Sequence, residues 1–229
     1  MSVVVPFPAT QPETTRDPSA TPGFVSFGDD PTVLTDIYKE NVNIAIWRRV
    51  LSSELLATAD AFAKANPAFE ISKILSPDDA VTTIYESLGT SADCVLSNNI
   101  AELVEMFCSL FELKRTGLRL GVLTRAMCPR FHVDRVPCRM ITTYQGCGSE
   151  WVPNDSLDRS KLGPGSGGLP DSHSGLLKSE TNIEQLGRGE VALLKGESWA
   201  GNEGAGLVHR SPAVSEGDHR LLLSLDFVN

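Results

Sequence analysis

The hydrophobic pattern of this chain changes its period once, near Gly117, and no other feature constrains the fold as strongly. Before Gly117, apolar residues recur at helical spacing, whereas after it they alternate with polar residues in short segments separated by glycine turns. No strand–helix–strand alternation is visible. Helices that precede strands in this way are typical of α+β folds with an antiparallel sheet or barrel. We therefore expect a helical N-terminal half and a strand-rich C-terminal half.

The 229 residues suit a single domain that follows an N-terminal arm. Residues 1–30 contain five prolines among Ser, Thr and Asp, which predicts a flexible, Pro-rich arm. The domain is expected over residues 31–229, with a helical part at 31–116 and a strand-rich part at 117–229. Within the second part, residues 153–189 are rich in Gly, Pro, Ser and Asp, and a loop of that length is usually functional or disordered.

Local signals indicate where the elements begin and end. The run from Ile44 to Ala65 has helical spacing and stops at Asn66-Pro67. Ser76-Pro77-Asp78-Asp79 is a strong helix start, because it combines a cap, a proline in the first turn and acids at the positive end of the dipole. A third helix is expected near Asn99, which resembles a capping box with Glu102. Strands are expected at residues 118–122, 139–144, 190–195, 206–210 and 220–227.

Composition excludes several classes of protein. The formal net charge of −9 argues against a surface that coats nucleic acid or binds a membrane. No apolar run approaches the roughly 18 residues of a membrane span, and the N-terminus lacks the pattern of a signal peptide. The five cysteines form no Cys-x-x-Cys pair, which indicates reduced thiols. We expect a soluble cytoplasmic protein with no nucleic-acid or membrane partner, and the pattern favours no particular oligomeric state.

Two separate segments carry the residue types of a metal centre. His132 and Asp134 lie two residues apart in an expected strand, so both side chains point to one face. His209 follows 77 residues later, in a second strand segment. Two imidazoles and one carboxylate can occupy one face of an octahedral metal and leave three positions open, which is diagnostic of non-haem Fe(II) oxygenases. The alternative for each residue is an ordinary strand position with a hydrogen-bonded neighbour.

Residues 117–227 resemble the 2-oxoglutarate/Fe(II) dioxygenase superfamily. His132-Val-Asp134, followed by a strand and a glycine turn, resembles its first metal-binding segment, and Val208-His-Arg-Ser-Pro212 resembles the second. Arg220 opens the final strand, where that superfamily often keeps the arginine that binds the cosubstrate's far carboxylate. The resemblance implies a double-stranded β-helix (jelly-roll, cupin-like) barrel onto which the helical half packs. The whole chain also resembles a bacterial family of uncharacterised proteins.

The resemblance further implies a cofactor set and the residues that hold it. His132, Asp134 and His209 would bind Fe(II), or another divalent metal such as zinc, and would be the catalytic centre. Arg220 would bind 2-oxoglutarate, with Tyr144 or Thr143 as a neutral donor. The superfamily often has Ser or Thr two positions after the arginine, but this chain has Leu222 there, and its hydroxyl comes at Ser224 on the same strand face.

Other polar residues have weaker interpretations. Cys128, Cys138 and Cys147 are spaced ten and nine apart, unlike the close pairs of thiolate zinc sites, so buried thiols are expected. His173 is expected to be solvated in the 153–189 loop, and His219 is expected to point away from the site. Arg130 shares the strand parity of His132, so it is expected to line the same pocket or to form a salt bridge.

Three functions remain open from the sequence. The first is a 2-oxoglutarate-dependent Fe(II) oxygenase that acts on a small molecule or on a protein side chain. The second is a non-catalytic, cupin-like protein that binds zinc or iron. The third is a metal-free structural or interaction protein on the same scaffold. Metal identity separates the first two, because zinc is redox-silent, whereas two histidines and a carboxylate with open positions suit iron.

Overall fold

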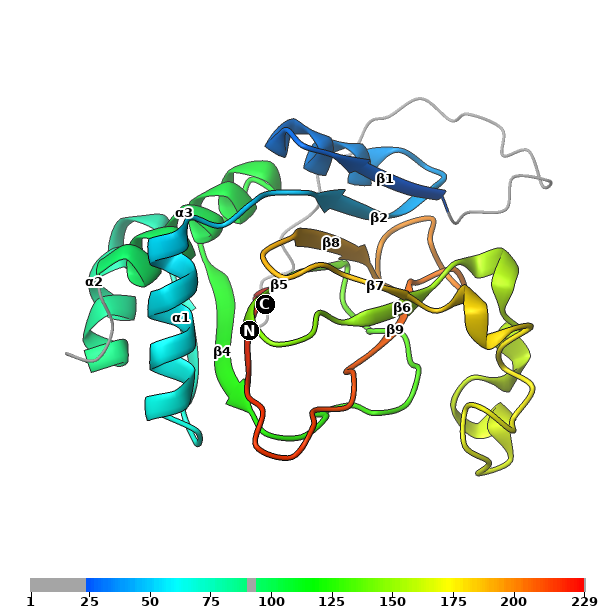
Figure 1. The fold of residues 1–229 in the computed structure, drawn as a ribbon. Coiled ribbons are helices and arrows are strands. Elements are labelled where there is room, and N and C mark those ends of the chain that lie inside the picture. Colours follow the sequence, from blue (N-terminus) through cyan, green and yellow to red (C-terminus); the bar gives the residue numbers. More distant parts are fainter. Residues whose placement is uncertain (1–23, 90–93, 229) are drawn as a thin grey trace, which may run out of the picture.

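A seven-stranded sheet forms the centre of the molecule (Figure 1). The computed structural model describes residues 24–89 and 94–228. The strands of this sheet are β1 (Phe24–Gly28), β2 (Val42–Trp47), β3 (Glu70–Leu75), β4 (Thr116–Leu123), β5 (Cys138–Gln145), β8 (Val191–Lys195) and β10 (Arg220–Phe227). Their spatial order is β1-β2-β8-β5-β10-β4-β3, with β1 and β2 parallel and every other pair antiparallel. The protein is therefore a mixed α/β structure organised around one large sheet.

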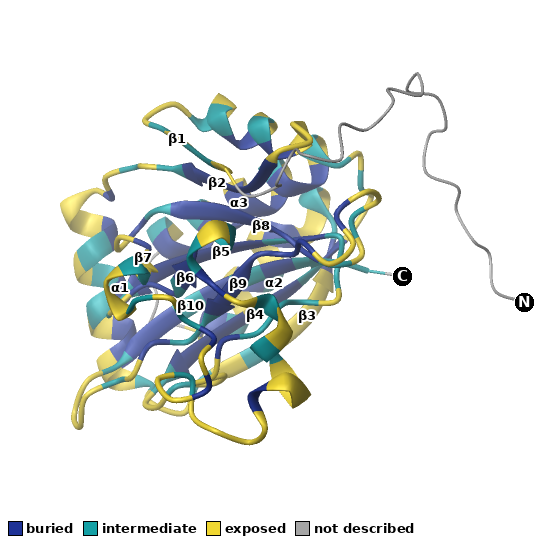
Figure 2. Cartoon of the chain, turned by 90° about the vertical axis from the view of Figure 1, so that its right-hand side faces the viewer, coloured by how far each residue is buried: buried dark blue, intermediate teal, exposed yellow. Residues whose placement is uncertain are grey.

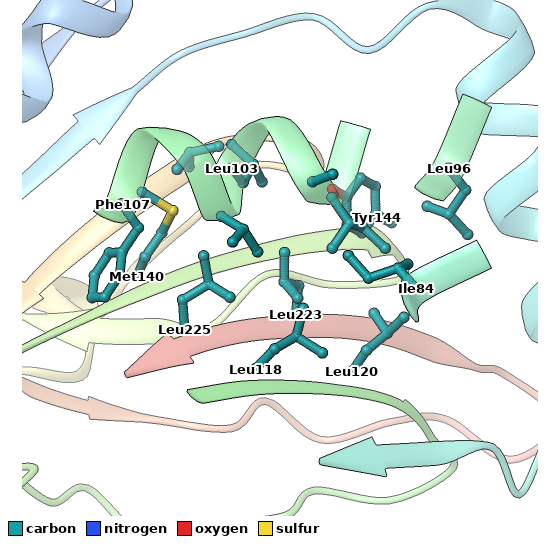
Figure 3. Packing of buried hydrophobic residues seen from close by; sticks show 14 of the residues in the cluster. Ile84, Leu96, Leu103, Phe107, Leu118, Leu120, Met140, Tyr144, Leu223 and Leu225 are labelled. Atoms are coloured by element: carbon teal, nitrogen blue, oxygen red, sulfur yellow. The ribbon is translucent and has the colours of Figure 1, made fainter. Parts of the chain in front are cut away.

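Helices cover one face of this sheet. They are α1 (Ser53–Ala65), α2 (Pro77–Leu88), α3 (Cys94–Leu110) and the 3-10 helix η1 (Pro31–Tyr38). Leu221, Leu223 and Leu225 of β10 are fully buried against them, in one cluster with Phe107 of α3 (Figure 3). Truncating one of these side chains to alanine would cost about 2 to 5 kcal/mol, because a cavity would remain.

The other face of the sheet is covered only in part. A small sheet of β7 (Glu184–Gln185), β6 (Glu150–Val152) and β9 (Val208–Arg210), in that order, lies on this side. Trp151 of β6 packs there with Ile44, Ile141 and Leu194, in a second apolar cluster over β2, β5 and β8. The part of the face formed by β10, β4 and β3 carries polar residues instead. In Figure 2 the strands are mostly dark blue and the outer loops and helix surfaces yellow.

The prediction of a wholly helical N-terminal half was wrong. Residues 42–47, expected to lead into a helix, form β2, and β1 and β3 also come from this half. Ala45 packs against the helix-side core while Ile44 and Ile46 pack against the small sheet. Because β2 is buried on both faces, its apolar residues do not alternate, and such a run cannot be told from a helix by its period alone.

The predicted helix ends were mostly right. Ser52 caps α1 by accepting from the Leu55 amide at 3.2 Å, and Ser76 and Asp79 form a capping box at the start of α2. Gly89 ends α2 with a φ of 68°, a conformation that favours glycine. Asn99, however, lies inside α3 rather than at its start, because that helix begins at Cys94.

The predicted arm and long loop are described in part. Residues 1–23 lie outside the described residues, whereas Phe24–Gly28 of the expected arm form β1. Residues 153–189 contain short 3-10 helices, η3 (Asn154–Ser156), η4 (Arg159–Lys161), η5 (Gly163–Ser166) and η6 (Glu180–Asn182), besides β7. Within the described ranges, no helix has both the length and the apolar character needed to cross a bilayer.

Candidate metal centre

The two predicted ligand segments meet at an isolated β-bridge. His132 and His209 exchange two backbone hydrogen bonds of 3.0 Å each. His209 lies on β9, whereas the segment around His132 is extended but forms no regular strand, unlike the prediction. This single bridge joins parts of the chain that are 77 residues apart. It brings the two imidazole rings to a centroid distance of 4.6 Å.

The three predicted ligands lie together. One nitrogen of His132, one nitrogen of His209 and one oxygen of Asp134 all lie within 4.8 Å of one another. The Asp134 carboxylate is 3.3 Å from His209 Nε2 and 3.6 Å from His132 Nε2. His209 is buried, and Asp134 and His132 are partly buried. Two imidazoles and a carboxylate at this separation form a set that could hold a divalent metal.

Both imidazoles are oriented through their second nitrogen. His132 Nδ1 lies 2.9 Å from the Arg130 carbonyl oxygen, and His209 Nδ1 lies 3.1 Å from the Leu207 carbonyl oxygen. A carbonyl oxygen only accepts, so both Nδ1 atoms carry a hydrogen, and the Nε2 atom of each ring faces Asp134. Metal-bound histidines are held in this way, with the free ring nitrogen hydrogen-bonded to the protein.

Arg139 also binds the Asp134 carboxylate. It donates to Asp134 Oδ2 at 2.7 Å and makes a two-point contact with Asp226, at 2.7 and 2.9 Å. Although burial alone would raise the pKa of the Asp134 carboxyl, hydrogen bonds from His132 and His209 and the Arg139 charge hold it well below its ordinary value. Asp134 is therefore a fixed anion, and its hydrogen bond raises the pKa of His132. The site favours positive charge.

Arg220 is buried without an acidic partner. It is 1% exposed, and its guanidinium donates to the Cys147 carbonyl at 2.7 Å. Its other partners are the hydroxyls of Ser149, Ser211 and Thr143, at 2.8, 3.1 and 3.2 Å. In the described ranges no carboxylate lies within ion-pair distance of it, and burial lowers its pKa to about 10. A buried cation without an anion is costly, so the arrangement suits an anionic ligand.

A cleft connects these two groups of residues. It opens on the part of the large sheet that the small sheet leaves uncovered, and the space among its lining residues, open solvent included, is about 650 Å³. Its lining includes two of the candidate metal ligands, His132 and His209, together with Arg139 and Ser224. It also includes Ser149 and Ser211, whose hydroxyls bind Arg220. The candidate metal ligands and the Arg220 partners therefore face one space.

The structure separates Tyr144 from the other predicted site residues. Tyr144 is fully buried on the helix side of the sheet, where its hydroxyl donates to Asn99 Oδ1 at 2.9 Å, and burial raises its pKa to about 12. The adjacent Thr143 points to the cleft side and binds Arg220. Ser224 lines the cleft but makes no hydrogen bond with Arg220 among the described residues.

The weaker candidates also have defined places. Cys138 is buried as expected, but Cys128 and Cys147 are exposed. In the described part of the chain, only His132, Asp134 and His209 form a group that could hold a metal. His173 is exposed and contacts Ser172. Arg130 forms an ion pair with Asp171 at 3.5 Å, which matches one of its two expected roles.

The sequence did not single out Arg139, Asp226, Ser149 or Ser211. Arg139 and Asp226 are 87 residues apart, and the two serines lie 71 and 9 residues from Arg220. The sequence held one clue: side chains alternate between the two faces of β10, which places Asp226 on the same face as Arg220 and Ser224. Their pairing depends on strand register, which no local pattern encodes.

The chain is similar to several solved oxygenases. For the dioxygenase for auxin oxidation 1 from Arabidopsis thaliana, in a 2-oxoglutarate binary complex, the match covers 90% of this chain and 92% of that one, at 12% identity and a TM-score of 0.45. For a prolyl-4-hydroxylase from Pseudomonas putida the coverage is 86% and 98%, at 11% identity and a TM-score of 0.48. For a 2OG-Fe(II) oxygenase family oxidoreductase from Burkholderia pseudomallei it is 85% and 87%, at 11% identity and a TM-score of 0.40.

A comparison with curated proteins found no match. A family model described as "Protein of unknown function (DUF1826)" matches residues 28–226. This match spans the helices, the sheets except most of β1 and the last residue of β10, and every candidate site residue named above. The chain belongs to the DUF1826 family.

Proposed function

We propose that this protein is a non-haem Fe(II), 2-oxoglutarate-dependent oxygenase whose substrate is a small molecule or a protein side chain. The observation that carries the proposal is Arg220, a buried guanidinium without a carboxylate partner in the described residues, set behind a cleft that the candidate metal ligands also line. A dicarboxylate keto acid could reach both places, with one end at the metal and the other at the arginine. Neither feature alone would favour this cosubstrate.

The residues at the candidate metal centre fit Fe(II). His132 and His209 would bind the metal through Nε2, and Asp134 presents an ionised carboxylate, so the donor set is two nitrogens and one oxygen. This set leaves positions for other ligands and is the one that non-haem Fe(II) oxygenases use. Iron held there would supply the oxygen and electron-transfer chemistry that protein side chains lack.

The chain's own residues would position both cofactors. Arg139 fixes the orientation of Asp134, and Asp226 in turn fixes Arg139. Arg220 would bind the far carboxylate through its planar fork, aided by the hydroxyls of Ser149 and Thr143. These hydroxyls would take the place of the Ser or Thr that the superfamily often has at the position of Leu222.

The 153–189 loop would exclude water from the cleft. Asp171 in this loop accepts a hydrogen bond from the Phe131 amide at 2.8 Å and lies 3.6 Å from Arg210. It thereby fixes the loop against the residue before His132. Excluding water protects oxidising chemistry from side reactions.

We also propose that residues 117–229 form the double-stranded β-helix of this superfamily. The support is the packing of the small sheet of β6, β7 and β9 onto β2, β5 and β8, which places apolar residues between two antiparallel layers. The metal ligands then lie where the two layers meet.

The test is an anaerobic titration of the metal-free chain with Fe(II) and then 2-oxoglutarate. Bidentate binding of the keto acid produces a visible charge-transfer band. We expect a saturable band in the wild type, no iron binding in His132→Ala, and iron binding with about a hundredfold weaker 2-oxoglutarate affinity in Arg220→Met. Lys195→Met is the matched control, because Lys195 is also a buried cation but does not line the cleft, and its band should be unchanged.

Each other outcome contradicts the proposal. Tight metal binding without a band would favour a zinc- or iron-binding protein that performs no oxidation. Absence of metal binding would favour a structural or interaction protein. A band retained in Arg220→Met would remove the role of that arginine.

A further inference from the structure

Two charged side chains in the cleft lack partners, whereas the others are neutralised. Arg139 is paired with Asp134 and Asp226, and Arg210 is paired with Glu150. Arg119 and Glu70 also line the cleft, but the side chain of neither has a hydrogen bond or ion pair within the ranges that the structure describes. One positive and one negative group are therefore available to a ligand.

Strand register places both groups on the cleft face. Glu70 of β3 pairs with Gly121 of β4, and Ser72 pairs with Arg119, so Glu70 and Arg119 are diagonal neighbours. Leu118 and Leu120, at the alternate positions of β4, are buried on the helix side. Diagonal residues on paired strands lie about 7 to 8 Å apart. That spacing suits two groups that each contact one of two adjacent, opposite charges.

Gly121 lies on the floor of the cleft between the two charged residues, beneath the Glu70 side chain. A Cβ at Gly121 would lie 3.8 Å from Glu70 Cγ and 4.0 Å from a Leu123 methyl, so the glutamate stem passes over the glycine. The space beside the two charges is not filled by a side chain from this position.

Glu70 and Arg119 are separate from Arg220, the residue proposed to bind the cosubstrate. Arg220 pairs with Leu123, which is four residues from Arg119 along β4. With a rise of about 3.3 Å per residue, the two arginines are about 13 Å apart along the sheet. An anionic group could therefore bind at either of two arginines, Arg220 or Arg119, and of these two only Arg119 has an acidic side chain, that of Glu70, beside it.

The remaining lining is apolar. Leu123, Met127, Ile141 and Leu222 contribute to the wall, and the Met127 side chain is 42% exposed. An apolar group would lie against these side chains, and methionine adapts to groups of different shapes.

We propose that the cleft binds a free α-amino acid with an apolar side chain as the substrate, with its carboxylate at Arg119 and its ammonium at Glu70. The inference rests on the proposed oxygenase function and names its substrate class. A lone anion would be repelled by Glu70, and a lone cation by Arg119. In a peptide the two backbone charges no longer lie on one residue, so the free amino acid fits the pair better.

The experiment measures binding by calorimetry to the full chain loaded with redox-silent Zn(II) and 2-oxoglutarate. The probes are two matched series, each an amino acid, its amine without the carboxylate, and its acid without the ammonium. They are leucine with isoamylamine and isocaproate, and phenylalanine with phenethylamine and hydrocinnamate. We expect at least one amino acid to bind about tenfold or more tightly than both of its analogues.

Two variants assign the charges to their residues. Arg119→Gln should weaken binding of the amino acid and the acid about tenfold but should not weaken binding of the amine. Glu70→Gln should weaken binding of the amino acid and the amine but should not weaken binding of the acid. Both positions are exposed, so the fold tolerates the changes. Arg115→Gln is the control, because Arg115 is exposed but does not line the cleft, and it should alter none of these affinities.

The outcomes separate this inference from the oxygenase proposal. No binding by either amino acid, or equal binding of an analogue, would overturn the inference while a charge-transfer band with Fe(II) would still support the oxygenase. Amino-acid binding that follows the predicted variants, without that band, would remove the oxygenase and leave an amino-acid site. Equal weakening of all three probes by either variant would also contradict the charge assignment.

Discussion

Two guanidinium groups lie on the cleft side of the large sheet, toward opposite ends of β10, and their partners differ in charge. Arg220 begins β10 and contacts only a carbonyl and hydroxyls, whereas Arg139 pairs with Asp226 near the end of the same strand and with Asp134. At the Arg139 end the positive charge is neutralised by carboxylates, whereas at the Arg220 end it is not. Arg139 thus serves the protein's own carboxylates, whereas Arg220 has no carboxylate partner among the described residues, which is the arrangement that the proposed anionic cosubstrate requires.

Among the variants that test this comparison, Arg139→Met has the largest expected effect. Removing the cation would leave Asp226 partly buried without its partner, and Asp134 with the two histidines alone, so we expect the free energy of unfolding to fall by about 3 kcal/mol. Urea denaturation of the metal-free chain at neutral pH measures it. A fall below about 0.5 kcal/mol would show that the two carboxylates are solvated and that Arg139 does not hold Asp134 in place.

The sequence could predict the ligands but not their supports. His132, Asp134 and His209 come from two short segments whose residue types already suggest a metal, and the structure brings them together. Their roles as ligands stay predictions. The supports come from strand pairing: Arg139 meets Asp226 only because β5 and β10 are antiparallel in a fixed register. Register depends on which face of the sheet is buried, and that information is distributed over the whole core.

Tyr144 and Thr143 illustrate the same limit within one strand. Period two places neighbouring residues on opposite faces, so the sequence predicts that only one of them can reach the cleft. The choice between them depends on which face the helices cover. The α3 helix covers the Tyr144 face, and Asn99 on that helix accepts the Tyr144 hydroxyl. Thr143 therefore contacts Arg220.

A second buried cation outside the cleft provides an internal reference for Arg220. Lys195 is 2% exposed, its ammonium donates to the Lys39 carbonyl at 2.9 Å, and burial lowers its pKa to about 8. The unfolded pKa is near 10.4, so the folded state binds fewer protons between about pH 8 and 10, and stability should rise with pH over that interval. Below pH 8 the penalty of a buried charge is fully present.

Lys195→Met removes this penalty. We expect the variant to be more stable than the wild type by about 2 kcal/mol at pH 7 and by progressively less toward pH 10, as measured by urea denaturation at both pH values. A constant difference across this range would mean that the ammonium is not desolvated. The reference for Arg220 would then be lost, because a buried cation without an acid would carry no measurable cost in this fold.

The smallest expected effect is the most decisive for the comparison. Arg220→Met relieves a desolvated charge but leaves the hydroxyls of Ser149 and Thr143 without a donor, and these contributions oppose each other. We expect the free energy of unfolding of the ligand-free chain to change by less than about 1 kcal/mol. Saturating 2-oxoglutarate with metal should stabilise the wild type by about 2.7 kcal/mol at a hundred times Kd, and the variant far less. If ligand-free Arg220→Met instead loses as much stability as Arg139→Met, both arginines stabilise the fold, and Arg220 is not kept for a ligand.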